Sequence, residues 1–472
     1  MLMKTADQTL TEQLASHFAE RIRCRLLAAG ARLPSVRQCA QQHAVSASTV
    51  VAAYDRLLAL GLVEARKNRG FYVRDLMQNG APVQDLYARE ATQNIASPAR
   101  RPIDATALMR GMFQGDSDKP QPGMGVLPPD WLDNSFMPAA VRRVAAGAAD
   151  FSRRYGDPAG DLGLRQSLSK KLLGLHVPAA PEQIITTVGA THALDIASRT
   201  LLRAGDCVMV EEPGWAVEFA RLEAMGMRIL PVPRNADGPD LEVMARYCEE
   251  HAPKLFVSVS VLHNPTGFCL TPGSAHRVLT LANAHDFYIV EDDTYSHLAP
   301  EHATRLCVLD GLQRTLYASG FSKILAPGWR VGFLAAPTAL VERLTNTKLL
   351  ATLTTPSLLE KALAWCIDQG QLRRHSEGVR ARLDQARTRS TKLALAAGCS
   401  FASEPAGLFG WVETGVDTDA LAQRMLDEGY MLAPGALFHA NRQPSSLMRI
   451  NFANTQDAAF WKVFARVRDG MP

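Results

Sequence analysis

The first seventy-five residues carry an apolar pattern that predicts three helices followed by a hairpin. Apolar residues recur at every fourth position from Leu10 to Leu26, which is one stripe of an amphipathic helix. Ser35 and Ser46 each precede a further helical segment, where a serine side chain can cap the first turn. Two short apolar runs then flank the turn Lys67–Gly70 and predict a β-hairpin. This order of elements is that of a winged helix-turn-helix.

Beyond this segment the pattern changes twice. Residues 76–122 hold five prolines and three glycines, so we interpret them as a linker with one short helix at Ala105–Phe113. From residue 123 to 472, short apolar runs alternate with helical stretches, which predicts an α/β fold with a largely parallel sheet covered by helices. The runs are Ile184–Val188, Cys207–Val210, Leu255–Val259, Tyr288–Val290, Leu316–Ala318 and Val331–Ala335. The predicted domains are therefore 1–75 and 123–472.

Charge is distributed unevenly between these domains. Residues 1–75 hold eleven lysines and arginines against six acids, whereas the rest of the chain holds 40 bases and 41 acids. A basic excess confined to the first segment is expected if that part alone meets a polyanion.

Cysteine usage and hydropathy bear on the cellular setting. The eight cysteines are scattered without a C-x-x-C pair, which argues against a zinc site or a disulfide framework and for a reducing compartment. The first residues do not form a signal peptide, and no segment approaches the ~18 apolar residues that a membrane helix needs. We therefore expect a cytoplasmic protein that binds no metal and does not enter a membrane.

The first domain offers residues suited to DNA. Small hydroxyls and free backbone N–H groups gather at the start of the second and third helices, and a recognition helix enters the major groove with its first residues. Residues 9–74 resemble the DNA-binding domain of the GntR regulators in LPSVRQCA, SASTVVAAYDRLLALGLVE and GFYV. The resemblance implies contacts to double-stranded DNA from Arg37, Ser46, Ser48, Thr49, Arg66 and Gly70. The alternatives are a winged helix kept for protein contacts and hydroxyls that only cap helices, above all Ser46.

In the second domain, SGFSKILAPGWRVG places Lys323 after a short strand and Arg330 seven residues later. A lysine held beside an aldehyde can bond to it covalently, and a guanidinium can grip a phosphate through two parallel hydrogen bonds. Four upstream motifs are suited to the rest of a flat, phosphorylated, aldehyde-bearing ring. VGATHAL offers an anion cradle at Ala190 and Thr191, and EEPGWAVE offers Trp215 for stacking on the ring. HNPTG offers the Asn264 amide as a donor to a phenolate oxygen. EDDTY offers Asp292 to pair with a pyridine nitrogen, with Tyr295 three residues later.

Together these motifs resemble the fold type I pyridoxal-phosphate enzymes, the aminotransferase family, over residues 123–472. The resemblance implies a large part at about 160–345 and a smaller C-terminal α+β part at about 346–472. It makes Lys323 the Schiff-base lysine, Asn264 and Tyr295 the partners of the phenolic oxygen, and pyridoxal phosphate the cofactor. It places the phosphate between Ala190, Thr191, Ser322 and Arg330.

Two further motifs match the family. Tyr155 in YGDPAG falls where the family's tyrosine reaches the neighbouring subunit's phosphate, which implies a homodimer with shared sites. Arg449 in LMRINF falls where an arginine clamps the substrate carboxylate. One position departs from the pattern: many members have a hydroxyl three residues before the lysine, and this chain has Gly320, with Ser319 one place earlier.

The two halves together resemble the MocR subgroup of GntR regulators, in which the second domain acts as a sensor. The primary hypothesis is therefore a transcriptional regulator that binds an operator and responds to an amino acid or amine. A working aminotransferase with a secondary DNA-binding domain is the second hypothesis, because every residue needed for transamination is present. A cofactor-free scaffold is the third.

Overall fold

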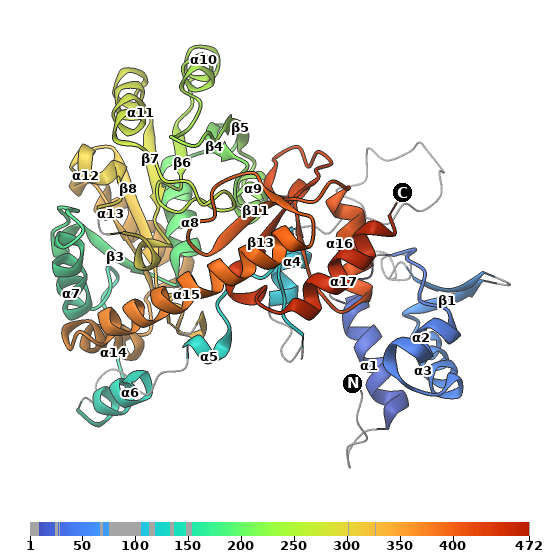
Figure 1. The fold of residues 1–472 in the computed structure, drawn as a ribbon. Helices are drawn as coiled ribbons and strands as arrows, with labels where there is room; N and C mark the ends of the chain where they lie inside the picture. The colour runs from blue at the N-terminus through green and yellow to red at the C-terminus, as the bar shows by residue number, and fades with distance from the viewer. Residues whose placement is uncertain are drawn as a thin grey trace, which may run out of the picture. The chain divides into compact units, whose positions relative to one another are not determined.

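The computed structural model describes residues 9–23, 27, 29–66, 69–74, 105–112, 119–132, 136–147, 153–300, 302–325 and 327–471. Within the chain two compact units form, residues 1–117 and 118–472, and each is described by itself (Figure 1). Three predictions fall outside the described residues: Leu26 as the end of the first apolar stripe, Lys67 in the turn of the hairpin, and the linker between residues 76 and 104.

The N-terminal unit has the predicted winged-helix order. Its elements are α1 (Leu10–Arg23), α2 (Val36–His43), α3 (Ala47–Ala59), β1 (Val63–Arg66), β2 (Gly70–Val73) and, after the linker, α4 (Ala105–Met112). Strand β1 pairs antiparallel with β2. The apolar stripe of α1 is buried through Leu14, Phe18 and Ile22, and the Tyr54 ring of α3 packs edge-on against Phe18 and Phe71.

Both serine caps are present. The Ser35 hydroxyl accepts from the Gln38 amide at the start of α2, and the Gln38 side chain accepts from the Ser35 amide in return. At the start of α3 the Ser46 hydroxyl accepts from the Thr49 amide at 3.1 Å. These bonds satisfy donors that a helix leaves free in its first turn, which explains why both helices begin where they do.

A seven-stranded sheet organises the C-terminal unit, in the order β3-β9-β8-β7-β6-β4-β5. The strands are β3 (Ile184–Thr187), β4 (Cys207–Glu212), β5 (Arg228–Pro233), β6 (Leu255–Ser258), β7 (Tyr288–Asp292), β8 (Thr315–Gly320) and β9 (Gly332–Ala335). All neighbouring pairs are parallel except those of β9, which runs antiparallel to β3 and β8. Each of the six predicted runs contributes a strand, and β5 is a strand that the pattern did not predict.

Helices cover both faces of this sheet. Alternate residues of β4 face two different hydrophobic cores. Val208 and Val210 pack against the helices on one face of the sheet, and Cys207 and Met209 pack against the helices on the opposite face. The first side is covered by α8 (Ala190–Leu201), α9 (Ala216–Ala224) and α13 (Thr338–Thr352), and the second by α10 (Leu241–His251), α11 (Pro272–His285) and α12 (Leu306–Asp310). Apolar runs without polar alternation are the pattern of a sheet buried on both faces.

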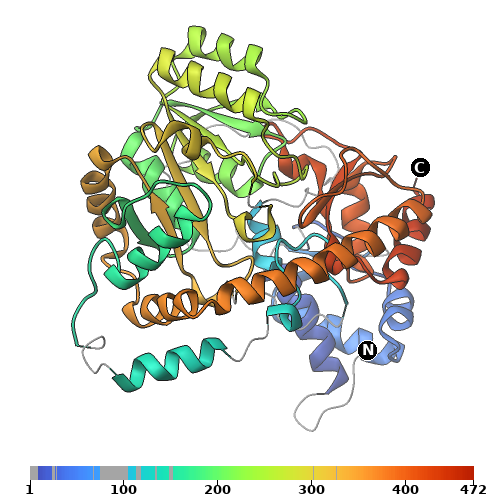
Figure 2. The same cartoon turned by 60° about the vertical axis from the view of Figure 1, so that its left-hand side comes forward.

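The last part of the chain forms a smaller α+β layer. Its antiparallel sheet has the order β10-β11-β13-β12, with strands β10 (Ser400–Phe401), β11 (Phe409–Glu413), β12 (Ala433–Pro434) and β13 (Leu447–Asn451). The helices of this part are α14 (Ser357–Asp368), α15 (Gln371–Ala396), α16 (Thr418–Asp427) and α17 (Ala458–Asp469). Figure 2 shows α15, in orange, as one long helix that crosses the unit toward the small sheet. The remaining helices, α5 (Pro129–Leu132), α6 (Phe136–Gly147) and α7 (Leu162–Leu173), precede the large sheet.

Candidate functional site

Lys323 lies in the turn after β8, half-buried, and its amine is held by backbone. The Nζ atom donates to the Gly125 carbonyl at 2.6 Å. Burial, helped by the nearby Arg449 and Arg330 guanidinium groups and opposed by Asp292, lowers the pKa of Lys323 to about 8. A lysine with that pKa is partly neutral near physiological pH, which is the form that attacks an aldehyde.

Asp292 ends β7 and lies buried in the same region. Its carboxylate accepts from the Thr294 hydroxyl at 2.5 Å and from the Thr294 amide at 3.0 Å. Burial above all, with the Glu218 carboxylate of α9 as a lesser cause, raises the pKa of Asp292 to about 6. Among the described residues it has no ion pair, so a protonated ring nitrogen would supply the cation that this carboxylate lacks.

Tyr295, Asn264 and Arg449 are buried and contact one another. The Arg449 guanidinium donates to the Asn264 side-chain oxygen at 3.1 Å and to the Gly123 carbonyl at 2.5 Å. Burial raises the pKa of Tyr295, opposed by Arg449 and by a hydrogen bond with Asn264. The tyrosine is therefore a neutral hydroxyl at physiological pH.

Arg449 is a buried cation that lacks an anion. Its acceptors are uncharged oxygens, its Nε has no hydrogen-bond partner, and no carboxylate pairs with it among the described residues. The rings of Phe409 and Phe438 lie 4.3 and 5.2 Å from its guanidinium carbon. Burial lowers the pKa of Arg449 to about 10, so the group stays charged at neutral pH. A buried cation of this kind is stabilised by a carboxylate.

A second anion site is built at the start of α8. Gly189 takes φ +78° there, and a Cβ on it would lie 2.7 Å from an Arg330 nitrogen. Arg330 itself is exposed and donates to the Ser322 hydroxyl at 3.2 Å and to the Val188 carbonyl at 3.1 Å. The amides of Ala190 and Thr191, as the first of a helix, lie beyond the reach of intrahelical acceptors. Together these groups are suited to an anion such as a phosphate, and we call them the phosphate cradle.

Gly320, the departure from the family pattern, lies against this cradle. A Cβ at Gly320 would be 3.2 Å from the Ala190 nitrogen, so glycine leaves that amide room. The neighbouring Ser319 is buried, and its hydroxyl donates to the Asp293 carbonyl at 2.8 Å. Ser319 is thus engaged with the backbone after β7 and does not replace the missing hydroxyl.

Trp215 follows β4 at the start of α9 and is half-buried. It lines a hollow together with Asp292, His263, Glu218 and Leu194. Four features of the site match pyridoxal phosphate. The buried carboxylate without a cation suits the pyridine nitrogen, and the lysine with a lowered pKa suits the aldehyde. The indole suits the flat ring, and the anion cradle suits the phosphate. The described residues therefore fit this cofactor.

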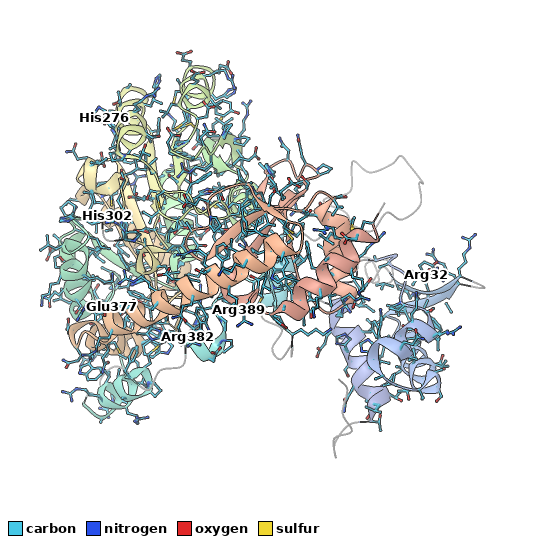
Figure 3. The ribbon with its side chains drawn as sticks, in the orientation of Figure 1. Arg32, His276, His302, Glu377, Arg382 and Arg389 are labelled. Atoms are coloured by element: carbon cyan, nitrogen blue, oxygen red, sulfur yellow. The ribbon has the colours of Figure 1, made fainter. Side chains whose placement is uncertain are left out.

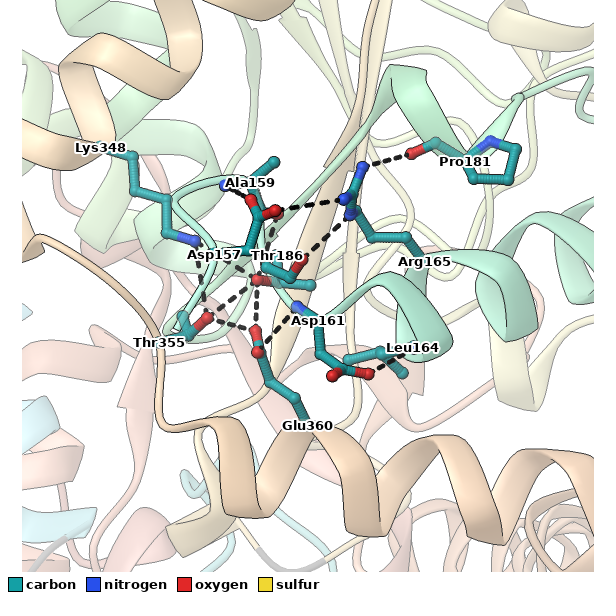
Figure 4. A network of polar contacts seen from close by, with 11 residues as sticks. Asp157, Ala159, Asp161, Leu164, Arg165, Pro181, Thr186, Lys348, Thr355 and Glu360 are labelled. Atoms are coloured by element: carbon teal, nitrogen blue, oxygen red, sulfur yellow. Dashed lines mark hydrogen bonds and ion pairs between the residues drawn. The ribbon is translucent and has the colours of Figure 1, made fainter. Parts of the chain in front are cut away.

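Tyr155 lies outside this cluster, and its side chain is 82% exposed. A network of polar contacts holds the segment that follows it, from Asp157 to Asp161 (Figure 4). Glu360 of α14 accepts from the Asp161 amide at 3.0 Å and from the hydroxyls of Thr186 and Thr355. The Lys348 amine donates to the same Thr186 hydroxyl at 3.3 Å. Thr186 lies in β3, two residues before Val188, whose carbonyl accepts from Arg330. The network is therefore close in sequence to the phosphate cradle.

The predicted DNA-contacting residues lie on the N-terminal unit, and several are engaged with one another. The Ser46 hydroxyl lies 2.8 Å from that of Ser48 and 2.7 Å from that of Thr49. Arg66 pairs with Glu64 at 2.8 Å and lies over the Tyr72 ring. Arg37 is exposed on the first turn of α2 and forms no ion pair with any described residue.

Sequence reasoning missed several contributors. Gly123 and Gly125, at the start of the predicted second domain, bring backbone carbonyls to Arg449 and Lys323, and neither was predicted as a site residue. A Cβ on Gly123 would lie 2.5 Å from the Leu432 backbone, so the spacing of glycines in PGMG was the available signal. Arg32 was also not predicted. It is exposed and forms a backbone β-bridge with Tyr72, and a Cβ on Gly70 would lie 3.4 Å from its Nε atom.

Comparison with known proteins agrees with both halves. The profile of the family "Aminotransferase class I and II" matches residues 128–467, and that of "Bacterial regulatory proteins, gntR family" matches residues 10–73. The uncharacterized HTH-type transcriptional regulator YjiR of Escherichia coli K12 is 28% identical, over 94% of this chain and 95% of its own. The probable rhizopine catabolism regulatory protein MocR of Rhizobium meliloti is 28% identical, over 80% of this chain and 76% of its own.

Solved structures share the fold of the C-terminal unit. Kynurenine aminotransferase from Pyrococcus horikoshii, in complex with PMP, superposes with a TM-score of 0.69 at 25% identity, over 77% of this chain and 92% of that one. The predictions of fold, of a GntR-type regulator in the MocR subgroup and of pyridoxal phosphate as cofactor are confirmed. In the part of the chain that the structure describes, no helix is long and apolar enough to span a bilayer.

Proposed function

This chain belongs to the aminotransferase class I and II family and carries a GntR-type DNA-binding domain ahead of it, and from that premise we propose that it regulates transcription in response to an amino acid. The observation that carries the proposal is the buried Arg449 cation, which has no anion among the described residues and lies beside the Lys323 amine. An α-amino acid has the carboxylate and the amine that these two groups would meet.

Each residue of the site has one task in this proposal. Pyridoxal phosphate supplies an electrophilic carbonyl and an electron-withdrawing ring when it is bound. Lys323 would hold the cofactor through its aldehyde carbon, and Asp292 would hold a proton at the ring nitrogen. Arg449 would bind the carboxylate of the effector, and Trp215 would pack against the ring and exclude water from it.

The remaining contacts hold the cofactor phosphate. We assign them to Arg330, Ser322 and the amides of Ala190 and Thr191, with Asn264 and Tyr295 at the phenolic oxygen. Tyr155 is assigned to the phosphate of a partner subunit in a homodimer, and its 82% exposure leaves it available for that contact. Sedimentation with and without Tyr155→Phe, together with cofactor affinity, tests this assignment.

The DNA contacts belong to Arg37, Ser46, Ser48, Thr49, Arg66 and Gly70. The experiment is a pair of titrations with the full chain: amino acids are added while the visible absorbance of bound cofactor is recorded, and DNA binding is measured with and without the amino acid that changes it. Arg37→Ala should weaken DNA binding and leave the absorbance unchanged. Absorbance that no amino acid alters, or DNA binding that Arg37→Ala does not affect, would contradict the proposal.

A second candidate is amino-group transfer. It is favoured by the lowered pKa of Lys323 beside Asp292 and Arg449, since the same groups would serve transamination. Turnover of amino acids with a keto-acid acceptor at ordinary enzyme rates, without specific DNA binding, would reverse the order of the two functions.

A further inference from the structure

The C-terminal unit contains one strongly basic helix, although the total charge of the unit is close to neutral. Helix α15 (Gln371–Ala396) carries seven lysines and arginines and two acids, a net charge of +5 over 26 residues. Residues 118–472 as a whole hold 36 bases and 37 acids. The averaged charge of this unit therefore conceals a strongly positive element on an otherwise acidic body.

The two acids of α15 are already engaged. Glu377 pairs with Arg373 at 2.8 Å, and Asp384 pairs with Arg387 at 2.7 Å. Arg374, Arg389 and Lys392 are exposed, and none of them forms an ion pair with a residue that the structure describes. Arg374 also donates to the Gln369 carbonyl at 3.3 Å, whereas Arg389 and Lys392 are free to meet an external anion.

These three bases lie along one side of the helix. At 3.6 residues per turn, Arg374, Arg389 and Lys392 fall within about 60° of one another around the axis and span about 27 Å along it. Arg382 lies on the same side, with half of its side chain exposed and a pairing to Asp130 at 2.8 Å. Figure 3 shows Arg382 and Arg389 following one another along α15. We call Arg374, Arg382, Arg389 and Lys392 the basic track.

Contacts within the fold engage the two bases at the start of α15: Arg373 pairs with Glu377, and Arg374 donates to the Gln369 carbonyl at 3.3 Å. The first turn of α15 has no acid and no side-chain cap, yet it contains Arg373 and Arg374. Bases at the N-terminus of a helix oppose its dipole and cost some stability. Arg389 and Lys392, toward the other end of the helix, are exposed and have no such contact with a described residue, so an external anion is the partner left for them.

We propose that the basic track binds the phosphate backbone of DNA without reading its sequence. The track's length of about 27 Å matches roughly eight base pairs of B-DNA, a regular row of phosphates. Backbone contacts of this kind add affinity and fix register but carry no sequence information. The inference rests on the proposed DNA-binding function, since the winged helix brings the DNA to the chain.

The test compares two triple variants of the full-length holo-protein. Arg374→Gln, Arg389→Gln and Lys392→Gln remove three charges from the track. The matched control, Arg228→Gln, Arg246→Gln and Arg277→Gln, removes three exposed charges elsewhere on the same unit. Binding to a mixed-sequence 60-base-pair duplex is measured over a range of salt concentrations. Equal visible absorbance and circular dichroism establish that both variants are folded.

We expect the track variant to bind the duplex on the order of tenfold more weakly, with a salt slope shallower by up to about 2.7, because about 0.9 counterions are released per phosphate contact. The control should match the wild type. Equal affinity and slope in both variants, with Arg37→Ala still weakening binding, would overturn this inference alone. Loss of binding to phosphatidylserine vesicles rather than to DNA would also overturn it. Absence of DNA binding in the wild type would overturn the proposed function as well.

Discussion

At the scale of the residue, the environment of Lys323 sets when the cofactor can be attached. Burial and the Arg449 charge stabilise the neutral amine, and the carbonyl of Gly125 holds it 2.6 Å away. An exposed lysine, with a pKa near 10.4, would have almost no neutral amine at pH 7. Lys323, with its pKa lowered to about 8, has a substantial neutral fraction there.

The pH dependence of cofactor loading follows from this pKa. Only the neutral amine attacks the aldehyde, so the loading rate should rise about tenfold per pH unit below pH 8 and level off above it. Stopped-flow absorbance after mixing pyridoxal phosphate with cofactor-free protein gives the rate. Lys323→Ala should show no covalent phase, and Lys254→Ala, at an exposed position, should behave as wild type. A rate that keeps rising beyond pH 9.5 would contradict the lowered pKa.

Arg449 should distinguish ligands by their carboxylate. Arg449→Lys keeps the charge but loses the planar fork, and one charge-assisted hydrogen bond contributes about 1.5–3 kcal/mol. We expect amino-acid affinity to fall by roughly ten- to a hundredfold, whereas the corresponding decarboxylated amine should bind equally to both proteins. Titrations followed by cofactor absorbance measure both ligands. An equal loss for acid and amine would show that the substitution damaged the site itself.

At the scale of the element, the hydroxyls at the start of α3 combine a structural and a functional role. Ser46 caps the helix, with its oxygen 3.1 Å from the Thr49 amide, whereas Ser48 makes no cap. Ser46→Ala should therefore lower the free energy of unfolding of the N-terminal unit by about 1 kcal/mol. Ser48→Ala should leave that stability unchanged and weaken DNA binding. Thermal unfolding and DNA titration of the two variants separate capping from contact, and identical behaviour in both assays would rule out the division of roles.

The elements themselves were largely predictable from the sequence, because buried parallel strands are nearly continuous apolar runs. Strand β5 was missed because Pro231 and Pro233 interrupt its pattern. Its position explains why they are tolerated: β5 is at the edge of the sheet, paired only with β4, and an edge strand can include residues that lack an N–H donor.

The site was predictable wherever a motif carried it, and unpredictable wherever tertiary packing did. Lys323, Asp292 and Arg449 lie in motifs, whereas the carbonyl of Gly125 reaches Lys323 across 198 residues of sequence. The Glu360 and Lys348 network is similar, because its members come from separate elements and none belongs to a recognisable pattern. Backbone acceptors and buried ion networks depend on how elements pack, and that information is spread over the whole chain.

At the scale of the whole molecule, a sensor and a DNA-binding unit in one chain are useful only if their equilibria are coupled. An amino acid can change DNA affinity only to the extent that it binds the DNA-competent state more or less tightly than the other state. The connection is covalent, because the two units follow one another in a single chain, residues 1–117 and 118–472. Coupling is therefore a property to be measured as a free energy, with typical values of about 1–3 kcal/mol.

Reciprocity gives the sharpest test of this coupling. If an amino acid changes the affinity of the full chain for its duplex by some factor, saturating duplex must change amino-acid affinity by the same factor, because both routes join the same four states. We expect a factor of roughly 5 to 150 in both directions. Fluorescence anisotropy of labelled DNA measures one side and cofactor absorbance the other. Arg449→Lys should shift the amino-acid concentration at which DNA affinity changes, whereas Arg37→Ala should not alter amino-acid affinity in the absence of DNA. Unequal factors would mean that the system is not at equilibrium because a second process, such as turnover of the amino acid, consumes the ligand during the measurement.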